Sequence, residues 1–301
     1  MLTYHNCELC PRRCKADRAK GQLGFCKAPD HIMAARAALH LWEEPCISGK
    51  NGSGTVFFSG CTLRCVFCQN HIISAENKGY PVTAEQLCRI FLDLQEQGAH
   101  NINLVTPTHF LPDIVPALQM AKQQGLHLPI VYNCGGYERV ETIRQLRGLV
   151  DVYLPDFKYM DDKLGEQYSN CANYSSIAKA AIQEMIDQCG DIVFDQDGIV
   201  TKGVIVRHLL LPRALNNAKA VVKYLYNTYH NCIWMSLMNQ YTPIPQVANI
   251  HPLCQRVTGD EYEAWIDYAI ELGVENAFVQ EGDSSDMQYI PSFNGEGIIA
   301  K

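Results

Sequence analysis

The sequence has no apolar run of the roughly 18–20 residues that a helix needs to cross a bilayer. It also has no excess of basic residues, because 25 Lys and Arg face 32 Asp and Glu and leave a net charge of −7. This balance argues against nucleic acid or an anionic membrane as the main partner, although it permits a locally basic cleft. The start of the chain shows no signal-peptide pattern. We therefore expect a cytoplasmic protein with no nucleic-acid or membrane partner.

Internal repeats and low-complexity segments are also missing. With 301 residues, 47% of them hydrophobic, the chain can bury a large core, and disorder is excluded. Cysteine, in contrast, is abundant at 14 residues. In a reducing compartment this number indicates metal or redox chemistry rather than disulfides, and half of the cysteines fall in two compact groups near the start of the chain.

From Gly54 onward, short β-rich runs alternate with amphipathic helical patterns, which predicts βα units around a parallel sheet. Capping-box patterns begin two of the helices, at Thr83 and Thr258, and Asp197-Gly198 indicates the turn of a hairpin. Six units fit a partial (β/α)6 barrel better than a closed eight-fold one. The candidate strands are residues 55–59, 101–105, 130–132, 151–154, 204–211 and 233–237, with 274–279 as a further one.

We expect two domains, a Cys-rich metal-binding extension over residues 1–50 and the barrel, with C-terminal helix and strand elements, over 51–301. The extension has no apolar periodicity and cannot build a core of its own. Its cysteines are Cys7, Cys10, Cys14 and Cys26. Four thiolates at this spacing predict a metal site, and both zinc and an auxiliary [4Fe–4S] cluster remain open. Nearby basic residues such as Arg12 can stabilise the thiolates.

The second cysteine group follows the first predicted strand as Cys61, Cys65 and Cys68, in a Cys-x3-Cys-x2-Cys loop. Iron–sulfur clusters bind thiolates, and three thiolates from one loop can hold three irons of a [4Fe–4S] cubane. Because no fourth cysteine follows at ferredoxin spacing, one iron keeps an open position for a substrate or cofactor. A zinc site with His71 as the fourth ligand is the alternative.

Residues 54–70, which contain this loop, resemble the cluster-binding signature of the radical S-adenosylmethionine superfamily, and within it the branch related to pyruvate formate-lyase activating enzymes. The resemblance extends to about Gln240, whereas the N-terminal extension is not part of the minimal activating enzymes. It implies that S-adenosylmethionine chelates the fourth iron and is reductively cleaved to methionine and a 5′-deoxyadenosyl radical, which abstracts hydrogen. It further implies an electron donor such as flavodoxin or ferredoxin, and a place for Phe67 near the adenine.

Further cofactor-binding residues are expected at the carboxyl ends of the predicted strands, where β/α barrels carry their active sites. The Gly-Gly-Glu-type motif of the family has no counterpart at residues 106–110, where Thr106 is the candidate in its place. Asn133 and Gly135 lie in a turn that resembles the Asp/Asn-Thr-x-Gly turn of the activating enzymes. Cys134, between them, is a candidate hydrogen donor.

Asp156 and Lys158 match the Asp-x-Lys motif of the glycyl-radical activating branch and are the candidate catalytic residues. Both can point into the barrel mouth, where Lys158 pairs with the cofactor carboxylate and Asp156 binds polar groups or a monovalent cation; a solvated ion pair is the alternative. Arg207 and His208 lie in an otherwise apolar strand, and the resemblance places the cofactor carboxylate or ribose beside Arg207. Because neighbours in a strand face opposite ways, both need not belong to the site.

The sequence therefore predicts a radical S-adenosylmethionine enzyme, an oxidoreductase. Activation of a glycyl-radical protein is favoured by Asp156-x-Lys158, and radical modification of a small molecule or peptide is favoured by the extra N-terminal cysteines. From another class, an iron–sulfur electron-transfer or sensing protein, or a zinc-stabilised binding protein, remains open.

Overall fold

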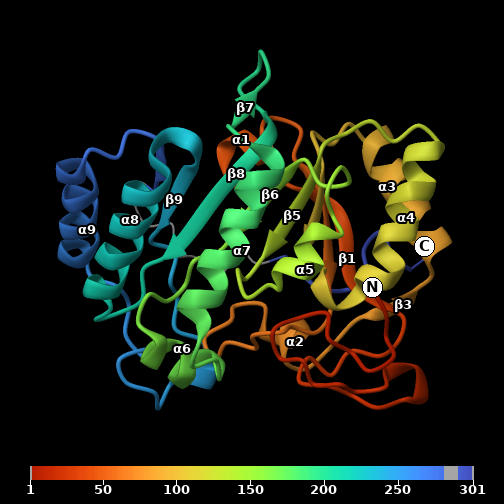
Figure 1. The fold of residues 1–301 in the computed structure, drawn as a ribbon, viewed down its shortest axis with the longest axis horizontal. Coiled ribbons are helices and arrows are strands. Elements are labelled where there is room, and N and C mark those ends of the chain that lie inside the picture. Colours follow the sequence, from red (N-terminus) through yellow and green to blue (C-terminus); the bar gives the residue numbers. More distant parts are fainter. Residues whose placement is uncertain (1, 281–290, 300–301) are drawn as a thin grey trace.

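The computed structural model describes residues 2–280 and 291–299 of the chain. Its centre is one sheet in the strand order β10-β9-β8-β6-β5-β4-β2-β1-β3 (Figure 1). Seven of these strands pair in parallel: β2 (Ser53–Phe58), β4 (Ile102–Val105), β5 (Ile130–Cys134), β6 (Val152–Pro155), β8 (Val200–Leu209), β9 (Trp234–Met238) and β10 (Ala277–Val279). Within the described residues, β10 and β3 are opposite edges of the sheet. The predicted partial, open α/β barrel is confirmed, with β10 as its seventh parallel strand.

The antiparallel strands at one edge of the sheet begin before residue 51. The sequence predicts a domain boundary at residue 51. Strand β1 (Ile32–His40) pairs with β2 from Ala34 to His40, and β3 (Tyr80–Val82) pairs with its other side. Alanine is weakly represented in strands, so sequence pattern did not mark β1. Pairing with the fully buried β2 nevertheless holds it in the sheet. The short β7 (Val193–Phe194) pairs antiparallel with β8 and forms the predicted hairpin.

Helices cover one face of the sheet, with α3 and α4 toward one edge, α8 and α9 toward the other and α7 in front of β6 and β8 (Figure 1). Both predicted capping boxes are present, at Thr83 with Gln86 and at Thr258 with Glu261. The longer helices are α3 (Ala84–Glu96), α4 (Leu111–Gln123), α5 (Val140–Arg144), α6 (Asp162–Ser169), α7 (Tyr174–Cys189), α8 (Leu215–Tyr229) and α9 (Gly259–Leu272). The short ones are α1 (Pro45–Ser48), α2 (His71–Ser74), and the 3-10 turns η1 (Arg18–Lys20), η2 (Thr108–Phe110), η3 (His230–Cys232) and η4 (Pro245–Val247).

The opposite face of the sheet is the inside of the open barrel, and α1 fills its amino-terminal end. Cys46 and Ile47 of α1 pack there in a small apolar cluster with Val131, Leu154 and Ile205. Because side chains alternate along a strand, the residues two further on, at positions 133, 156 and 207, emerge on this same inner face nearer the carboxyl ends. Along the inside of the barrel, three apolar side chains near the amino-terminal end are thus followed by three polar ones nearer the carboxyl-terminal end.

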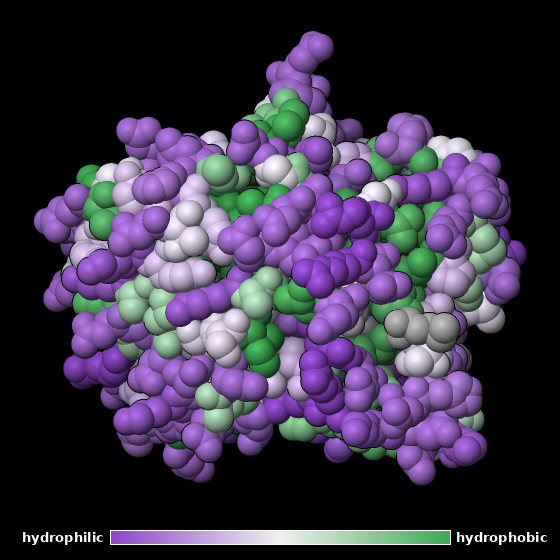
Figure 2. Space-filling view, viewed as in Figure 1, coloured by the Kyte–Doolittle hydropathy of each residue, from purple (hydrophilic) through white to green (hydrophobic). Residues whose placement is uncertain are grey.

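The outer surface is mainly hydrophilic on the face shown in Figure 2, with apolar side chains between the polar ones. None of the helices in the described part of the chain has the length and apolarity that a membrane crossing requires.

Candidate active site

A cavity of about 900 Å³ lies on the inner face of the barrel. It brings together all three cysteines of the triad and seven of the predicted cofactor-binding residues. The predicted residues that line it are Cys61, Cys65, Cys68, Phe67, Thr106, Asn133, Gly135, Asp156, Lys158 and Arg207, together with Cys134. This is the carboxyl-terminal side of the parallel strands, where α/β barrels place their chemistry.

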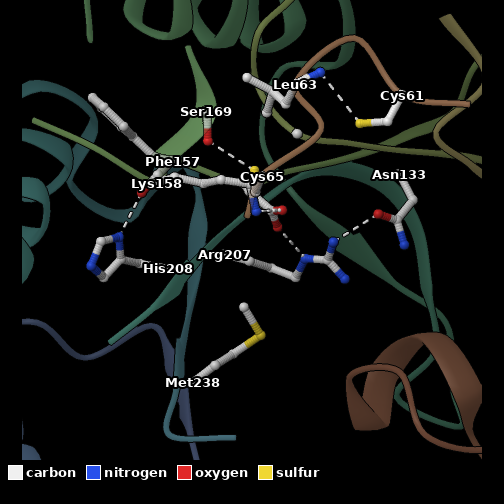
Figure 3. Close-up of polar contacts among 12 residues, drawn as sticks. Cys61, Leu63, Cys65, Asn133, Phe157, Lys158, Ser169, Arg207, His208 and Met238 are labelled. Carbon is white, nitrogen blue, oxygen red and sulfur yellow. Dashed lines mark hydrogen bonds and ion pairs between the residues drawn. The ribbon is translucent and has the colours of Figure 1, made fainter. Parts of the chain in front are cut away.

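His208 is the one predicted cofactor-binding residue that the structure places elsewhere. It faces the helices rather than the cavity, and a ring nitrogen lies 2.5 Å from the carbonyl oxygen of Phe157 (Figure 3). Its ring packs edge-on against Trp265, with the ring centroids 5.3 Å apart. Burial lowers the pKa of His208 to about 4, so the ring is neutral. Neighbouring side chains alternate along β8, so with His208 packed against Trp265 of α9, Arg207 is the one that faces the cavity.

The triad loop holds its sulfur atoms with hydrogen bonds from the chain. The Leu63 N–H donates to Cys61 Sγ at 3.4 Å, and the Ser169 hydroxyl donates to Cys65 Sγ at 2.9 Å (Figure 3). The Ser169 oxygen is in turn 2.7 Å from the hydroxyl of Tyr159. Donors of this kind stabilise thiolate charge and are typical of iron–sulfur ligands. Sequence reasoning missed Ser169, which lies about a hundred residues beyond the loop and carries no motif.

The donor set fits a [4Fe–4S] cluster. Three soft thiols from one loop face one cavity, and burial raises the pKa of Cys61 to about 12 and also raises that of Cys68. Thiols of this kind need a bound metal to be stable as thiolates. His71, the alternative zinc ligand, pairs instead with Glu76 at 3.1 Å. Across residues 2–280 and 291–299, no three His, Cys, Asp or Glu side chains form a preformed single-ion site. The assignment therefore stands on the chemistry of the thiols.

An ion-pair network occupies the middle of the cavity. Arg207 donates to Asp156 Oδ1 at 2.9 Å, to Glu43 Oε2 at 3.1 Å and to Asn133 Oδ1 at 2.7 Å, and Lys158 Nζ lies 2.5 Å from Asp156 Oδ2. The anionic partners of Arg207 are thus carboxylates of the chain itself. Burial acts to raise the pKa of Asp156, but the two cations hold it below its ordinary value. Both oxygens of Asp156 already accept hydrogen bonds from cations, so the geometry lends no support to a monovalent ion there.

Glu43 and Glu44, just before α1, are cavity residues that sequence reasoning missed. They had been assigned to the N-terminal extension, and only the acidic doublet before Pro45 could have marked them. The structure also shows an unusual backbone conformation at Thr106. Its φ is +58°, in the left-handed region that β-branched residues rarely adopt. Its N–H donates to the Asn133 carbonyl at 2.8 Å, which ties these two cavity residues together.

The four N-terminal cysteines lie close together. Cys7, Cys10 and Cys26 are buried and Cys14 is exposed. The pKa of Cys10 is raised first by burial and then by Cys26 and Cys7, and the pKa of Cys26 is raised by burial and further by Cys7 and Cys14. The folding of residues 1–30 therefore gathers the four thiols that the sequence assigned to one metal site, although the metal itself remains a prediction.

The basic residues of this segment act on the barrel as well as on the thiols. Arg12, between Cys10 and Cys14, donates to the Thr62 carbonyl at 2.9 Å and to the Ser169 carbonyl at 2.7 Å, and also to the carbonyl of Asn170. Its guanidinium carbon lies 3.8 Å from the centre of the Phe25 ring. Because Thr62 is in the triad loop and Ser169 bonds Cys65, Arg12 joins the N-terminal cysteine segment to the cluster site.

A second arginine extends this contact. Arg18 is only 1% exposed and donates to the carbonyl of His109 in η2 at 2.6 Å. His109 in turn lies 2.7 Å from the carbonyl of Ser59, at the end of β2 just before the triad. The N-terminal segment therefore packs on the same end of the sheet as the triad loop, beside α2 (Figure 1).

A family model, that of the radical SAM superfamily, matches residues 55–192. Residues 55–192 form a radical SAM domain. This radical SAM domain begins in β2 and contains the triad and every predicted cavity residue except Arg207. It implies a [4Fe–4S] cluster and S-adenosylmethionine, and radical SAM enzymes usually take their electrons from flavodoxin or ferredoxin.

Two curated relatives extend the comparison. The chain is 29% identical over 282 residues to an uncharacterized protein of Methanocaldococcus jannaschii, covering 90% of this chain and 76% of the relative. It is 32% identical over 124 residues to the pyruvate formate-lyase-activating enzyme of Clostridium pasteurianum, covering 38% of this chain and 50% of that enzyme. The chain thus matches about half the length of the activating enzyme.

Among solved structures, the chain is similar to SuiB of Streptococcus suis bound to its precursor peptide SuiA. The identity is 14% and the TM-score 0.49, over 73% of this chain and 46% of SuiB. The chain therefore spans less than half of SuiB.

Proposed function

We propose that this chain reductively cleaves S-adenosylmethionine to methionine and a 5′-deoxyadenosyl radical, and that this radical abstracts hydrogen from a substrate held in the cavity. The observation that carries the proposal is that Cys61, Cys65 and Cys68 open onto the same cavity as the Asp156–Lys158–Arg207 network. When bound, the cluster supplies the electron for the cleavage.

The residues of the chain divide the work. The three cysteines would hold three irons of the cluster, and the donors from Leu63 and Ser169 stabilise charge on two of the sulfur atoms. Lys158 interacts with Cys65, so it lies at the triad end of the network and presents a cation to the carboxylate of the cofactor. Asp156 fixes that ammonium group and raises its pKa against the effect of burial, so Lys158 stays charged.

The remaining predicted residues shape the cofactor site. Phe67 is 6% exposed and held edge-on by Tyr168 and Tyr241, which fixes its ring for packing near the adenine. Thr106 and Gly135 line the cavity, Thr106 in place of the missing Gly-Gly-Glu-type motif. Asn133 is already bonded to Arg207 and Glu43 and acts by holding that network.

Two substrate classes follow from different observations. The pair Asp156 and Lys158, seen at the cavity, and the Clostridium pasteurianum relative support activation of a glycyl-radical protein. A cavity of about 900 Å³, with α1 packed into one end of the barrel, supports a small molecule or the end of a peptide beside the cofactor. We propose the small molecule or peptide, because the N-terminal cysteine segment and the enclosed barrel end are features of this structure.

The test is formation of 5′-deoxyadenosine by anaerobically reconstituted protein with S-adenosylmethionine and dithionite, measured by chromatography beside Cys65→Ala. We expect the product with the unaltered chain only. Equal, background amounts in both would refute radical chemistry. An EPR signal of the reduced cluster that does not change when S-adenosylmethionine is added would instead support an electron-transfer or sensing protein.

The N-terminal metal is tested by an iron count. We propose an auxiliary [4Fe–4S] cluster on Cys7, Cys10, Cys14 and Cys26, so the unaltered protein should bind about eight irons and the Cys61/Cys65/Cys68→Ala variant about four. About four irons and none, respectively, with zinc in both proteins, would assign zinc to this site.

A further inference from the structure

The cavity contains an acidic end that the proposed reaction does not use. Glu43 and Glu44 form it, directly before α1. Glu43 pairs with Arg207, but Glu44 Oε2 is buried and has no hydrogen-bond partner among the described residues. Glu44 as a whole is 8% exposed. A buried carboxylate oxygen without a partner is costly, so its retention calls for a ligand or a proton.

The charges that line the cavity do not balance. The carboxyl groups are those of Glu43, Glu44 and Asp156, and the permanent cations are Lys158 and Arg207, so three acidic groups face two cations. Burial raises the pKa of Glu43 and of Glu44, and Arg207 acts to lower both. His40 also lines the cavity, but burial and the nearby Arg36 lower its pKa to about 4, so it adds no positive charge near neutral pH. One acidic group among the described lining residues is therefore not matched by a cation. Because Glu44 Oε2 has no hydrogen-bond partner, Glu44 is the group that a proton or a cationic ligand would neutralise.

The order of contacts puts Glu43 and Glu44 at the end of the network away from the triad. Lys158 interacts with the thiols of Cys65 and Cys68. Asp156 joins Lys158 to Arg207, and Arg207 reaches Glu43. Glu44 also interacts with Arg207, and it lies beside Ser236 of β9. The network therefore runs from the triad at one end to Glu44 at the other.

The surroundings of Glu44 suit an organic cation. Trp42 and Phe278 line the same cavity, and Phe278 is the register partner of Ser236 in the parallel pairing of β10 with β9. Aromatic faces and carboxylates together attract ammonium and guanidinium groups, and aromatic rings also pack against alkyl chains. A small inorganic ion would gain nothing from contact with these apolar side chains, whereas an organic cation would pack against them.

We propose that the acidic end, Glu43 and Glu44, binds an ammonium or guanidinium group of the substrate and so selects amine-bearing compounds or basic peptides. The inference rests on the proposed radical function and names its substrate class. The sulfonium and ammonium groups of S-adenosylmethionine are a second source of positive charge. The triad end is where that cofactor chelates iron, so the substrate is assigned to the acidic end.

The experiment is calorimetric titration of reconstituted protein with 1,5-diaminopentane and, as its neutral counterpart, 1,5-pentanediol, each with and without saturating S-adenosylmethionine. Glu44→Gln removes the charge at nearly the same volume, and Glu44→Asp keeps it. The matched control is Glu263→Gln, on the exposed side of α9. Because Gln has nearly the volume of Glu and carries no charge to bury, Glu44→Gln should fold, and far-UV circular dichroism checks this.

We expect the diamine to bind more tightly than the diol with S-adenosylmethionine present. Glu44→Gln should weaken diamine binding by about ten- to a hundredfold, while Glu44→Asp and Glu263→Gln retain it. Three results would overturn the proposal: equal binding of diamine and diol, diamine binding unaffected by Glu44→Gln, or its loss when S-adenosylmethionine is added. Failure of the radical function is a separate result, since it appears as missing 5′-deoxyadenosine in the unaltered protein.

Discussion

Replacement of Arg12 by alanine should loosen the triad loop although Arg12 belongs to the N-terminal cysteine segment. Arg12 makes three hydrogen bonds to backbone carbonyls and stacks on Phe25. The bond to Asn170 is exposed and contributes little, which leaves two half-buried bonds at about 1–1.5 kcal/mol each and about 0.5–1 kcal/mol from the ring. We therefore expect the free energy of unfolding to fall by about 2.5–4 kcal/mol.

The assay is urea unfolding of the metal-free protein followed by circular dichroism, together with the iron content of the reconstituted protein after desalting. Arg13→Ala is the matched control, because Arg13 is the exposed neighbour and its removal costs the same charge. Arg12→Ala should lower the urea midpoint and the iron retained by the triad, and Arg13→Ala should change neither. Equal midpoints for the two variants would refute the link between the N-terminal segment and the triad loop.

Three further predictions concern the surroundings of the site. Ser169→Ala should make the reduction potential of the triad cluster more negative in an EPR-monitored titration, because a donor to Cys65 is lost, and Ser169→Thr should restore it; an unchanged potential contradicts the role. Gly136→Ala should destabilise the chain by about 2–4 kcal/mol, because φ is +74° and a Cβ collides with the Asp156 carbonyl, and a Gly125→Ala control, with open space around it, should cost less in the same urea assay. Burial raises the pKa of Glu138 to about 8. A carboxyl whose pKa is higher in the folded state stabilises the fold below its unfolded pKa, and this contribution is lost as the pH rises toward the folded pKa. The free energy of unfolding should therefore decline between about pH 4.5 and 8, and Glu138→Gln should remove about 3–5 kcal/mol of that decline. An unaltered pH profile of stability in Glu138→Gln would disprove this.

Much of the fold was predictable because parallel strands and capping boxes leave local signals. The strand after Gly54, the capping boxes and the Asp197-Gly198 hairpin all depend on neighbours within a few residues. Strand β1 was missed, because its alanines become a strand only when β2 lies beside them. The local sequence pattern gives no information about a partner strand that is distant in the sequence.

The residues of the candidate site likewise include some that the sequence predicts and some that it does not. The triad is compact in sequence, and its loop opens onto the cavity as expected. Glu44 and Ser169 reach the site only because α1 inserts into the barrel and α6 ends beside the triad loop. A single residue that enters a site in this way belongs to no motif, so the sequence pattern does not predict its role. For Arg207 and His208, alternation showed that they diverge, but only the position of the helices decided which one faces inward.

The bond from Arg12 to Ser169 joins residues 157 positions apart in the chain. Contacts of such high sequence separation form late in folding, because the intervening loop must close first. The N-terminal segment is synthesised before α6, so it cannot make this contact until Ser169 has also been made. Insertion of iron and sulfide at the triad should accordingly be a post-translational event that follows docking, and the triad loop of a truncated nascent chain should capture iron poorly.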